Sequence, residues 1–254
     1  MVDNASVDKT WDICQKYQNR DRRVRVFKNK TNIGPVLNWM KCAEYAEGEY
    51  VKILFSDDVL MPNCLEAMVP FLNNAQVGLV FSSVLIRSSE GERTSYRWKK
   101  RSGVFNAREF IRESLISIGE PKTPVSPCAA MFRRHDFISN LLYQIPTSTA
   151  NDFSRHGAGP DLLLFLLTLN NYEKVAFVNR PLMLFRSHYG SITISKRRIV
   201  EERYICSKMW YAESYLGLFG KLLLFMEWLK WMRRNARLVR YNHFYRKFFK
   251  VKKN

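Results

Sequence analysis

Two adjacent carboxylates, Asp57 and Asp58, are the first residues of this chain whose position suggests chemistry. They follow a mainly apolar run from Tyr50 to Phe55, interrupted only by Lys52, which predicts a strand buried on both faces. Open α/β sheets bind ligands at the carboxyl ends of such strands. Carboxylate oxygens can hold Mg²⁺ or Mn²⁺, and the ion can neutralise the diphosphate of a nucleotide. A solvated acidic turn is the simpler alternative.

The charge of the chain is high and unevenly distributed. Lys and Arg number 41 and Asp and Glu 23, which gives a formal net charge of +18. From Lys221 to the end, eleven basic residues accompany a single acid, Glu227. Such a segment favours anionic lipid, nucleic acid or an acidic partner. With 254 residues, 46% of them hydrophobic, the chain has the size and apolar content of a globular protein.

The cysteines and the N-terminus predict a location. Five scattered cysteines without a CxxC pair indicate free thiols in a reducing compartment rather than disulfides or a zinc site. No run reaches the roughly 18–20 apolar residues of a membrane span, and no signal peptide precedes Asp3. We therefore expect a cytoplasmic protein, which its C-terminus could hold on the cytosolic face of a membrane.

Apolar runs and turn residues predict strands that alternate with helices through roughly the first 90 residues, which indicates βα units and a mainly parallel sheet. The predicted strands are 24–27, 50–55, 77–86, 128–133, 175–178 and 182–185. The predicted helices are 10–17, 36–46, 64–72, 106–117, 136–142, 162–169 and a helical region from Ile199 onward. The chain contains no internal repeat and no glycine-rich phosphate loop of the Walker or GxGxxG kind.

Several short motifs occur in an order and at a spacing that resembles the family 2 glycosyltransferases of the GT-A fold. They are Asp3-Asn4-Ala5-Ser6 with Asp8-Lys9-Thr10, Asn32-Ile33-Gly34 with Asn38, Ala46-Glu47-Gly48-Glu49-Tyr50, and Ser56-Asp57-Asp58 with Pro62. The resemblance covers residues 1 to about 90 and extends more loosely to about 195. The looser part contains Gly119-Glu120-Pro121, Met131-Phe132-Arg133-Arg134 and Arg186-Ser187-His188. Each motif alone is weak, and the ordered set carries the resemblance.

This resemblance implies roles for the motif residues. Asp57 and Asp58 would form the metal site. One acid would bind the metal ion, and the other would bind either the ribose of the nucleotide sugar or the same metal ion. Asp3 would hydrogen-bond the nucleobase. The residues that would line the nucleotide are Asn32, Gly34 and Asn38. The alternatives are a helix N-cap for the motif at Asp3 and an ordinary tight loop for the motif at Asn32.

Asp161 stands before the apolar run 162–167, where the family has an acid that acts as catalytic base. A sugar hydroxyl is a poor nucleophile until a base takes its proton. Asp161 could instead only cap its helix, and Asp152 is the competing acid. His188 could join the metal or the phosphates as a neutral imidazole, or be structural, and Arg186 could face phosphate.

An apolar face runs along the predicted C-terminal helix. Its members are Leu222, Phe225, Leu229, Met232, Ala236 and Val239, flanked by Lys230, Arg234 and Arg237. The simpler interpretation is a helix packed on the domain with a solvated basic side, and the functional one is an interfacial helix on anionic lipid. Nucleic acid is disfavoured, because no nucleic-acid-binding motif accompanies the basic residues.

The sequence thus predicts an α/β protein of the GT-A kind, with a mainly parallel sheet flanked by helices. Residues 1–195 would form the glycosyltransferase domain, with a nucleotide-sugar half (1–90) and an acceptor half (91–195), and residues 196–254 a basic helical extension. The family's opening strand, the turn after it and the first helix are missing, so we expect the fold to lack this strand. Either the gene product is shortened and poorly active, or its start was assigned too late.

The predicted function is transfer of a sugar from a nucleotide-diphosphate donor to a hydroxyl acceptor by single displacement with inversion. Asp161 would be the base, and Mn²⁺ or Mg²⁺ the cofactor. The acceptor would be a glycan or a lipid-linked glycan, as in the synthesis of cell-surface polysaccharides. The alternative is an impaired, shortened glycosyltransferase that acts as a binding or partner protein.

Overall fold

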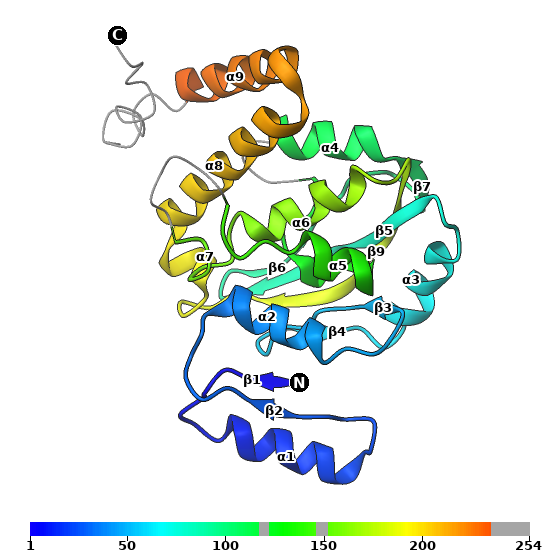
Figure 1. Cartoon of the computed structure of the whole chain (residues 1–254), viewed down its shortest axis with the longest axis vertical. Coiled ribbons are helices and arrows are strands. Elements are labelled where there is room, and N and C mark those ends of the chain that lie inside the picture. The colour runs from blue at the N-terminus through cyan, green and yellow to red at the C-terminus, as the bar shows by residue number, and fades with distance from the viewer. Residues whose placement is uncertain (117–121, 146–151, 235–254) are drawn as a thin grey trace.

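A seven-stranded mixed sheet forms the centre of the computed structural model, which describes residues 1–116, 122–145 and 152–234 (Figure 1). Its strands are β3 (Tyr50–Val51), β4 (Val59–Leu60), β5 (Val77–Ser88), β6 (Gly91–Ser95), β7 (Gly103–Asn106), β8 (Ala130–Arg133) and β9 (Lys174–Arg186). The helices are α1 (Thr10–Arg20), α2 (Pro35–Glu44), α3 (Cys64–Leu72), α4 (Ala107–Ile116), α5 (Arg134–Asn140), α6 (Pro160–Leu169), α7 (Ile192–Ser195), α8 (Arg197–Tyr215) and α9 (Gly217–Arg234), and a 3-10 turn, η1 (Pro127–Ala129), precedes β8.

The prediction of a mainly parallel sheet is wrong. The order is β3-β8-β5-β9-β4, with β6 beside β5 and β7 beside β9, and only the central pair β5–β9 is parallel. The physical reason is that β3 and β4 are two-residue strands that pair with β8 and β9, from the second half of the chain. Alternation of strands and helices along the first 90 residues therefore did not determine the pairing partners.

A second, two-stranded sheet joins β1 (Val2–Asp3) to β2 (Phe27–Lys28) in parallel, with α1 as the connection. This unit lies below α2 in Figure 1, at one end of the molecule. Phe27 stacks on Tyr45, with ring centroids 3.7 Å apart, so apolar contact joins β2 to the end of α2. The predicted absence of the family's opening strand stays a prediction.

The strand predicted over 50–55 is only partly formed. β3 ends at Val51, and Leu54 is 50% exposed, so this run is not buried on both faces. The apolar residues beyond β3 line a cleft instead of pairing in the sheet. The apolar residues of this run therefore line a cleft, and sequence periodicity does not distinguish such a lining from a buried strand.

The strands predicted at 175–178 and 182–185 are one long strand, β9. Its register with β5 shifts where Ser82 pairs with Val178 and Ser83 with Pro181, which leaves Asn179 and Arg180 as a bulge. Asn179 is held there by hydrogen bonds to the hydroxyl of Ser102 (2.9 Å) and the carbonyl of Lys100 (2.8 Å). The bulge lets β9 continue as far as the site described below.

The core lies between the sheet and α6. Every residue of α6 is buried, as expected for a helix that is apolar on all sides. The aromatic residues packed around this region are Phe81, Trp98, Phe110, Phe132, Phe165 and Phe177. The first turn of α6, which carries Asp161, is therefore held by a rigid element.

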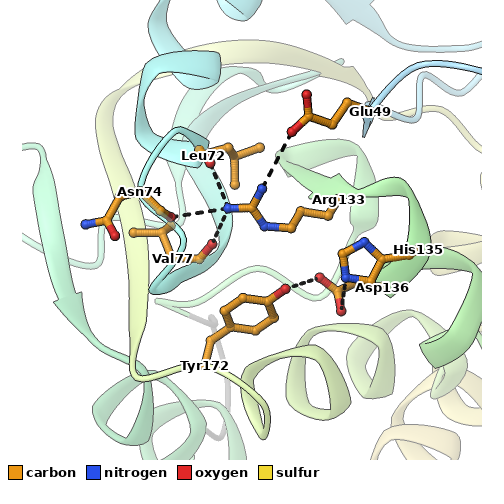
Figure 2. A network of polar contacts seen from close by, with 8 residues as sticks. All are labelled: Glu49, Leu72, Asn74, Val77, Arg133, His135, Asp136 and Tyr172. Atoms are coloured by element: carbon orange, nitrogen blue, oxygen red, sulfur yellow. Dashed lines mark hydrogen bonds and ion pairs between the residues drawn. The ribbon is translucent and has the colours of Figure 1, made fainter.

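Arg133 fastens β8 to the segment that joins α3 to β5 (Figure 2). Its guanidinium donates hydrogen bonds to the carbonyls of Leu72 (2.7 Å), Asn74 (3.2 Å) and Val77 (3.5 Å). Carbonyls at the end of a helix have no intrahelical donor, and this side chain supplies one. In the same view, the hydroxyl of Tyr172 donates to the carboxylate of Asp136 at 2.7 Å. This bond links the segment between α6 and β9 to α5.

The short helix α7 and the longer helices α8 and α9 follow the last strand of the sheet. α8 packs against α6 and buries Cys206, Tyr211 and Ala212, and α9 continues at the upper end of the molecule in Figure 1. Within the described ranges, no helix is long and apolar enough to cross a membrane. Ala236, Arg237 and Val239 of the predicted apolar helix lie outside the described residues. The domain boundary at residue 195 and the basic extension over 196–254 stay predictions.

Candidate active site

A cleft of about 2750 Å³ brings together most of the residues singled out in the sequence. The predicted site residues that line it are Asp3, Asn38, Asp57, Asp58 and Asp161, together with Arg186. Three further predicted residues support the lining: His188 contacts Asp57, and Asn32 and Gly34 hydrogen-bond to Asn4 of the lining. The contact of His188 with Asp57 joins two residues that are 131 positions apart in the chain.

The acidic pair sits in a turn between β3 and β4. The amide of Asp58 donates to the carbonyl of Phe55 at 3.1 Å, which closes the turn. Nε2 of His188 lies 3.4 Å from Oδ2 of Asp57, and these side chains are 54% and 44% exposed. A carboxylate and an imidazole thus meet at the open face of the cleft.

Arg186, the last residue of β9, clamps this turn from the other side. Its amide donates to Oδ1 of Asp58 at 3.3 Å, and its guanidinium donates to the carbonyls of Ser56, at 3.3 Å, and Asp57. The guanidinium is thus engaged by backbone oxygens of the acidic turn. The predicted phosphate contact of Arg186 would have to be made in addition to these bonds.

The two acids do not have equivalent surroundings. Burial, and then the neighbouring Asp57 carboxylate, raise the pKa of Asp58 to about 6, although Arg186 and Lys52 act in the opposite direction. Lys52 is itself largely desolvated, which lowers its pKa, and its ammonium donates to the carbonyl of Cys128. A carboxyl with such a pKa changes its charge in the mildly acidic to neutral range, where a proton would compete with any cation bound to it.

The donors at this end of the cleft fit a metal that is shared with a diphosphate. Mg²⁺ usually binds one or two carboxylates and completes its shell with phosphate oxygens and water. Asp57, Asp58 and His188 supply carboxylate oxygens and one imidazole. Among the described residues, no three His, Cys, Asp or Glu side chains are grouped so that they could hold a metal ion, and Asp57, Asp58 and His188 are therefore not such a group in this structure. A metal at this position would require oxygens from the nucleotide.

Asparagines build a second part of the cleft lining. The side-chain amide of Asn4 donates to Asn32 (3.0 Å) and to the carbonyl of Gly34 (3.2 Å), and its oxygen accepts the amide of Ile33 (3.0 Å). Side-chain bonds of this kind replace regular backbone pairing in a loop. The loop before α2 is therefore fixed to the end of β1.

Asn29 is a residue that the sequence analysis did not single out. Its amide donates to Asn4 at 3.0 Å and to Asn38 at 2.9 Å, and Asn38 donates to the carbonyl of Val2 at 3.2 Å. The available signal was the concentration of asparagines between residues 4 and 38. These bonds hold β1, β2 and α2 in one arrangement.

Asp3 and Gly34 complete this part of the site. Asp3 is buried, and its carboxylate accepts the amide of Ser6 at 3.2 Å. Gly34 has φ +83°, and a Cβ at this position would lie 3.1 Å from the carbonyl oxygen of Ser154. Glycine is favoured here both by conformation and by space. The nucleotide loop predicted at 32–34 therefore packs against the loop that leads into α6.

Asp161, in the first turn of α6, is only 7% exposed but borders the cleft. Oδ1 accepts the amides of Gly159 (2.8 Å) and Leu162 (2.7 Å), and Oδ2 accepts the hydroxyl of Tyr204 (2.7 Å). Burial raises the pKa of Asp161 to about 7, against the effect of these hydrogen bonds. A carboxyl with a pKa near ambient pH is suited to accept a proton.

The competing acid, Asp152, has a different environment. Its carboxylate accepts the amide (3.0 Å) and the hydroxyl (2.5 Å) of Ser154 and pairs with Arg155 at 3.0 Å. These bonds lower its pKa, with the hydroxyl of Ser154 as the largest cause. Asp152 is therefore committed to its own loop, whereas Asp161 borders the cleft.

The chain is similar to curated glycosyltransferases. It is 33% identical over 92 residues to the uncharacterized glycosyltransferase MJ1057 of Methanocaldococcus jannaschii, which is 36% of this chain and 32% of that protein. It is 32% identical over 91 residues, 36% of each protein, to the putative teichuronic acid biosynthesis glycosyltransferase TuaG of Bacillus subtilis. The chain thus matches about one third of the length of these relatives.

Solved structures share the fold. A fragment of S. aureus TarS in complex with UDP-GlcNAc superimposes with a TM-score of 0.56 at 16% identity, over 84% of this chain and 62% of that one. A TarS fragment in complex with UDP gives a TM-score of 0.55 at 17% identity, over 80% of this chain and 54% of that one. At this identity the match shows a common α/β fold with a mixed sheet flanked by helices.

The family assignment depends on the N-terminal half of the chain, which contains the asparagine cluster, the acidic turn and β3 to β8. The family model described as glycosyl transferase family 2 matches residues 1–140, more than half of the sequence. This range agrees with the part in which the ordered motifs occur. The chain belongs to glycosyl transferase family 2.

Proposed function

We propose that this chain is an inverting glycosyltransferase that moves a sugar from a nucleotide-diphosphate donor to a hydroxyl acceptor. The observation that carries the proposal is a single cleft that is lined by the acidic pair Asp57 and Asp58 and also by the buried carboxyl of Asp161. Transfer with inversion requires a group that binds the leaving diphosphate and a separate base for the acceptor hydroxyl.

Asp57, Asp58 and His188 would bind the metal ion. Glycosyltransferases of this fold often use a divalent metal, and Mn²⁺ or Mg²⁺ suits these donors. Such an ion would neutralise charge on the departing diphosphate. The guanidinium and amide of Arg186 keep the acidic turn in place, because they bond to its backbone and to Asp58. The diphosphate would then lie on the side of the cleft that is next to β4.

The nucleoside would lie toward β1. Asp3 would hydrogen-bond the base, and Asn32, Gly34 and Asn38 would shape the pocket together with Asn4 and Asn29. TarS was crystallised with UDP and with UDP-GlcNAc, which makes uridine diphosphate sugars the first donors to test. The printed name of TuaG refers to teichuronic acid biosynthesis, and this supports a role in cell-surface polysaccharide synthesis.

Asp161 would take the proton of the acceptor hydroxyl as that oxygen attacks the anomeric carbon. The bond from the sugar to the diphosphate breaks on the opposite side, and the configuration inverts. The proton remains on Asp161 until solvent removes it. With a pKa of about 7, the carboxyl is partly ionised in the neutral range and can act as this base.

The acceptor would be a glycan or a lipid-linked glycan at an anionic membrane on the cytosolic side. Leu218, Leu222 and Phe225 of α9 line the cleft and are exposed, Leu218 by 75%. The surplus of basic residues from Lys221 onward would attract anionic lipid. Exposed apolar residues next to basic ones favour a membrane surface over nucleic acid, which we regard as an unlikely partner.

Activity is tested by incubating the chain with a panel of nucleotide sugars and measuring release of the nucleotide diphosphate, with Mn²⁺, with Mg²⁺ and with EDTA. We expect metal-dependent release, and loss of it in Asp58→Asn and Asp161→Asn. Metal-independent release, or full activity of both variants, would contradict the proposal. A chain that binds UDP but releases none from any donor would support the alternative, an impaired glycosyltransferase that acts as a binding or partner protein.

A further inference from the structure

α8 contributes directly to the surroundings of Asp161. The hydroxyl of Tyr204 donates to Oδ2 of Asp161 at 2.7 Å, although 43 residues separate them. Both residues border the cleft. Tyr204 belongs to a helix that follows the family match over residues 1–140, so neither the family motifs nor sequence spacing indicated its involvement.

The hydrogen bonds of the Asp161 carboxylate leave one of its lone-pair sites for the hydroxyl of the acceptor substrate. An ionised carboxylate offers about four acceptor sites, two on each oxygen. The amides of Gly159 and Leu162 use both sites on Oδ1. Tyr204 uses one site on Oδ2, so the remaining site on Oδ2 is where a substrate hydroxyl can bind. The phenol thereby determines the direction from which the carboxylate can take a proton.

The packing of α8 against α6 makes this arrangement rigid. Gly159 has φ +105°, and a Cβ on it would lie 2.4 Å from the hydroxyl oxygen of Ser207, so α8 packs directly against the backbone whose amide binds Asp161. Seven residues after Tyr204, on the same side of α8, Tyr211 donates its hydroxyl to the side chain of Asn170, just beyond the end of α6. Two tyrosines of α8 therefore bind the two ends of α6.

We propose that Tyr204 is a positioning residue for the base: its hydroxyl holds Oδ2 of Asp161 in the orientation that receives the acceptor's proton, and α8 is thereby part of the acceptor site. This inference rests on the proposed function for its catalytic consequence. The hydrogen bond itself can be tested without it.

The titratable groups that face Asp161 are Tyr204 from α8 and Tyr96 from the segment after β6. Both phenols are buried, which raises their pKa values, so they stay neutral in the range where Asp161 titrates. Donation by Tyr204 favours the ionised carboxylate. Loss of the hydroxyl therefore raises the pKa of Asp161 further.

The test compares Tyr204→Phe with Tyr211→Phe in the full chain. Each variant loses one hydroxyl that links α8 to α6, but only the first loses a bond to Asp161. For Tyr204→Phe we expect kcat to fall about tenfold at neutral pH with the donor KM unchanged, and the acid limb of the pH–rate profile to move up by about one unit. Tyr211→Phe should keep the pH profile of the unmodified chain, and thermal unfolding of both variants reports any structural loss.

A second measurement does not need activity. The carboxyl ¹³C resonance of Asp161, assigned with Asp161→Asn, should titrate at higher pH in Tyr204→Phe and at an unchanged pH in Tyr211→Phe. An unchanged Asp161 titration in Tyr204→Phe, or equal shifts in both variants, would overturn the inference. Absence of transfer activity in the unmodified chain, together with a shifted titration in Tyr204→Phe, would refute the proposed function but keep Tyr204 as the residue that positions Asp161.

Discussion

The imidazole of His188 lies 3.4 Å from the carboxylate of Asp57, at the point where the end of β9 meets the turn between β3 and β4. Both side chains are about half exposed to solvent, so the contact is not forced by burial. Arg186, two residues earlier, bonds to the same turn. At the end of β9, Arg186 thus holds the acidic turn in place, and His188 supplies a nitrogen atom beside it.

His188→Ala should weaken Mn²⁺-dependent binding of UDP by about tenfold or more, because the metal loses a donor or the partner of one. Calorimetric titration with UDP in the presence of Mn²⁺ and of EDTA measures this effect. His135→Ala is the matched control, since His135 also lies 3.4 Å from an aspartate, Asp136, but this aspartate, unlike Asp57, does not line the cleft. Equal affinities of the two variants would rule out a role of His188 at the metal.

Binding of metal and nucleotide should weaken as the pH falls below about 6. The pKa of Asp58 is raised to about 6, mainly by burial, so the carboxyl becomes protonated in this range and protons compete with the ion. Titrations with UDP and Mn²⁺ between pH 5 and pH 7.5 measure the dependence. Asp58→Asn should remove both the affinity and its pH dependence. A dependence that persists in Asp58→Asn would assign it to another group.

Asp161 should make the fold less stable as the pH rises from about 4 to about 7. Its pKa is near 3.8 in the unfolded chain and about 7 in the folded one, so in this window the folded state binds more protons. The free energy of unfolding then decreases with rising pH. Urea unfolding at several pH values should show a smaller decrease in Asp161→Asn. Equal slopes in the two proteins would show that Asp161 ionises normally.

Gly34→Ala should lower the affinity for UDP and destabilise the fold by about 1–3 kcal/mol, because the residue would be strained at positive φ. The added Cβ would also press on the carbonyl of Ser154. Gly91→Ala is the control: Gly91 also has positive φ, +119°, but a Cβ there meets nothing within 4 Å. Both variants should lose stability, and only Gly34→Ala should lose UDP affinity.

The full chain should co-sediment with vesicles that contain phosphatidylglycerol, and less so at high salt or when residues 221–254 are removed. Leu222→Glu, within the exposed part of α9, should weaken binding in the full chain because it removes apolar contact and adds a negative charge. Leu65→Glu alters a comparably exposed leucine on α3 and should have no effect. Equal sedimentation with and without residues 221–254 would refute the membrane proposal.

Local sequence patterns predicted the helices better than the sheet. The helix predicted at 64–72 has the bounds of α3, and the helix predicted at 162–169 lies within α6, because an apolar periodicity and a proline or cap mark such elements locally. Strand pairing is not local. The partners of β3 and β4 come from β8 and β9, so neither the mixed sheet nor the short length of β3 could be derived from the run at Tyr50.

The candidate site shows the same limit. Asp57, Asp58 and Asp161 were identified because an acid after or before an apolar run, in the family's order, is visible in the sequence. The contacts of Arg186 with the acidic turn and of Tyr204 with Asp161 depend on tertiary packing across 128 and 43 residues. Asn29 was missed because it belongs to none of the family motifs, although it bonds two asparagines that do.

The continuity of α6 and β9 has a consequence for how such a protein can diversify. Asp161 begins this helix–turn–strand segment and His188 follows its end, and most of the segment is buried. The length of this segment therefore determines the spacing between the proposed base, Asp161, and the proposed metal ligand, His188. α8 and α9 follow this segment in the chain, and residues of both helices line another side of the cleft. Substitutions there can change which acceptor is admitted while the spacing of the reacting groups is preserved.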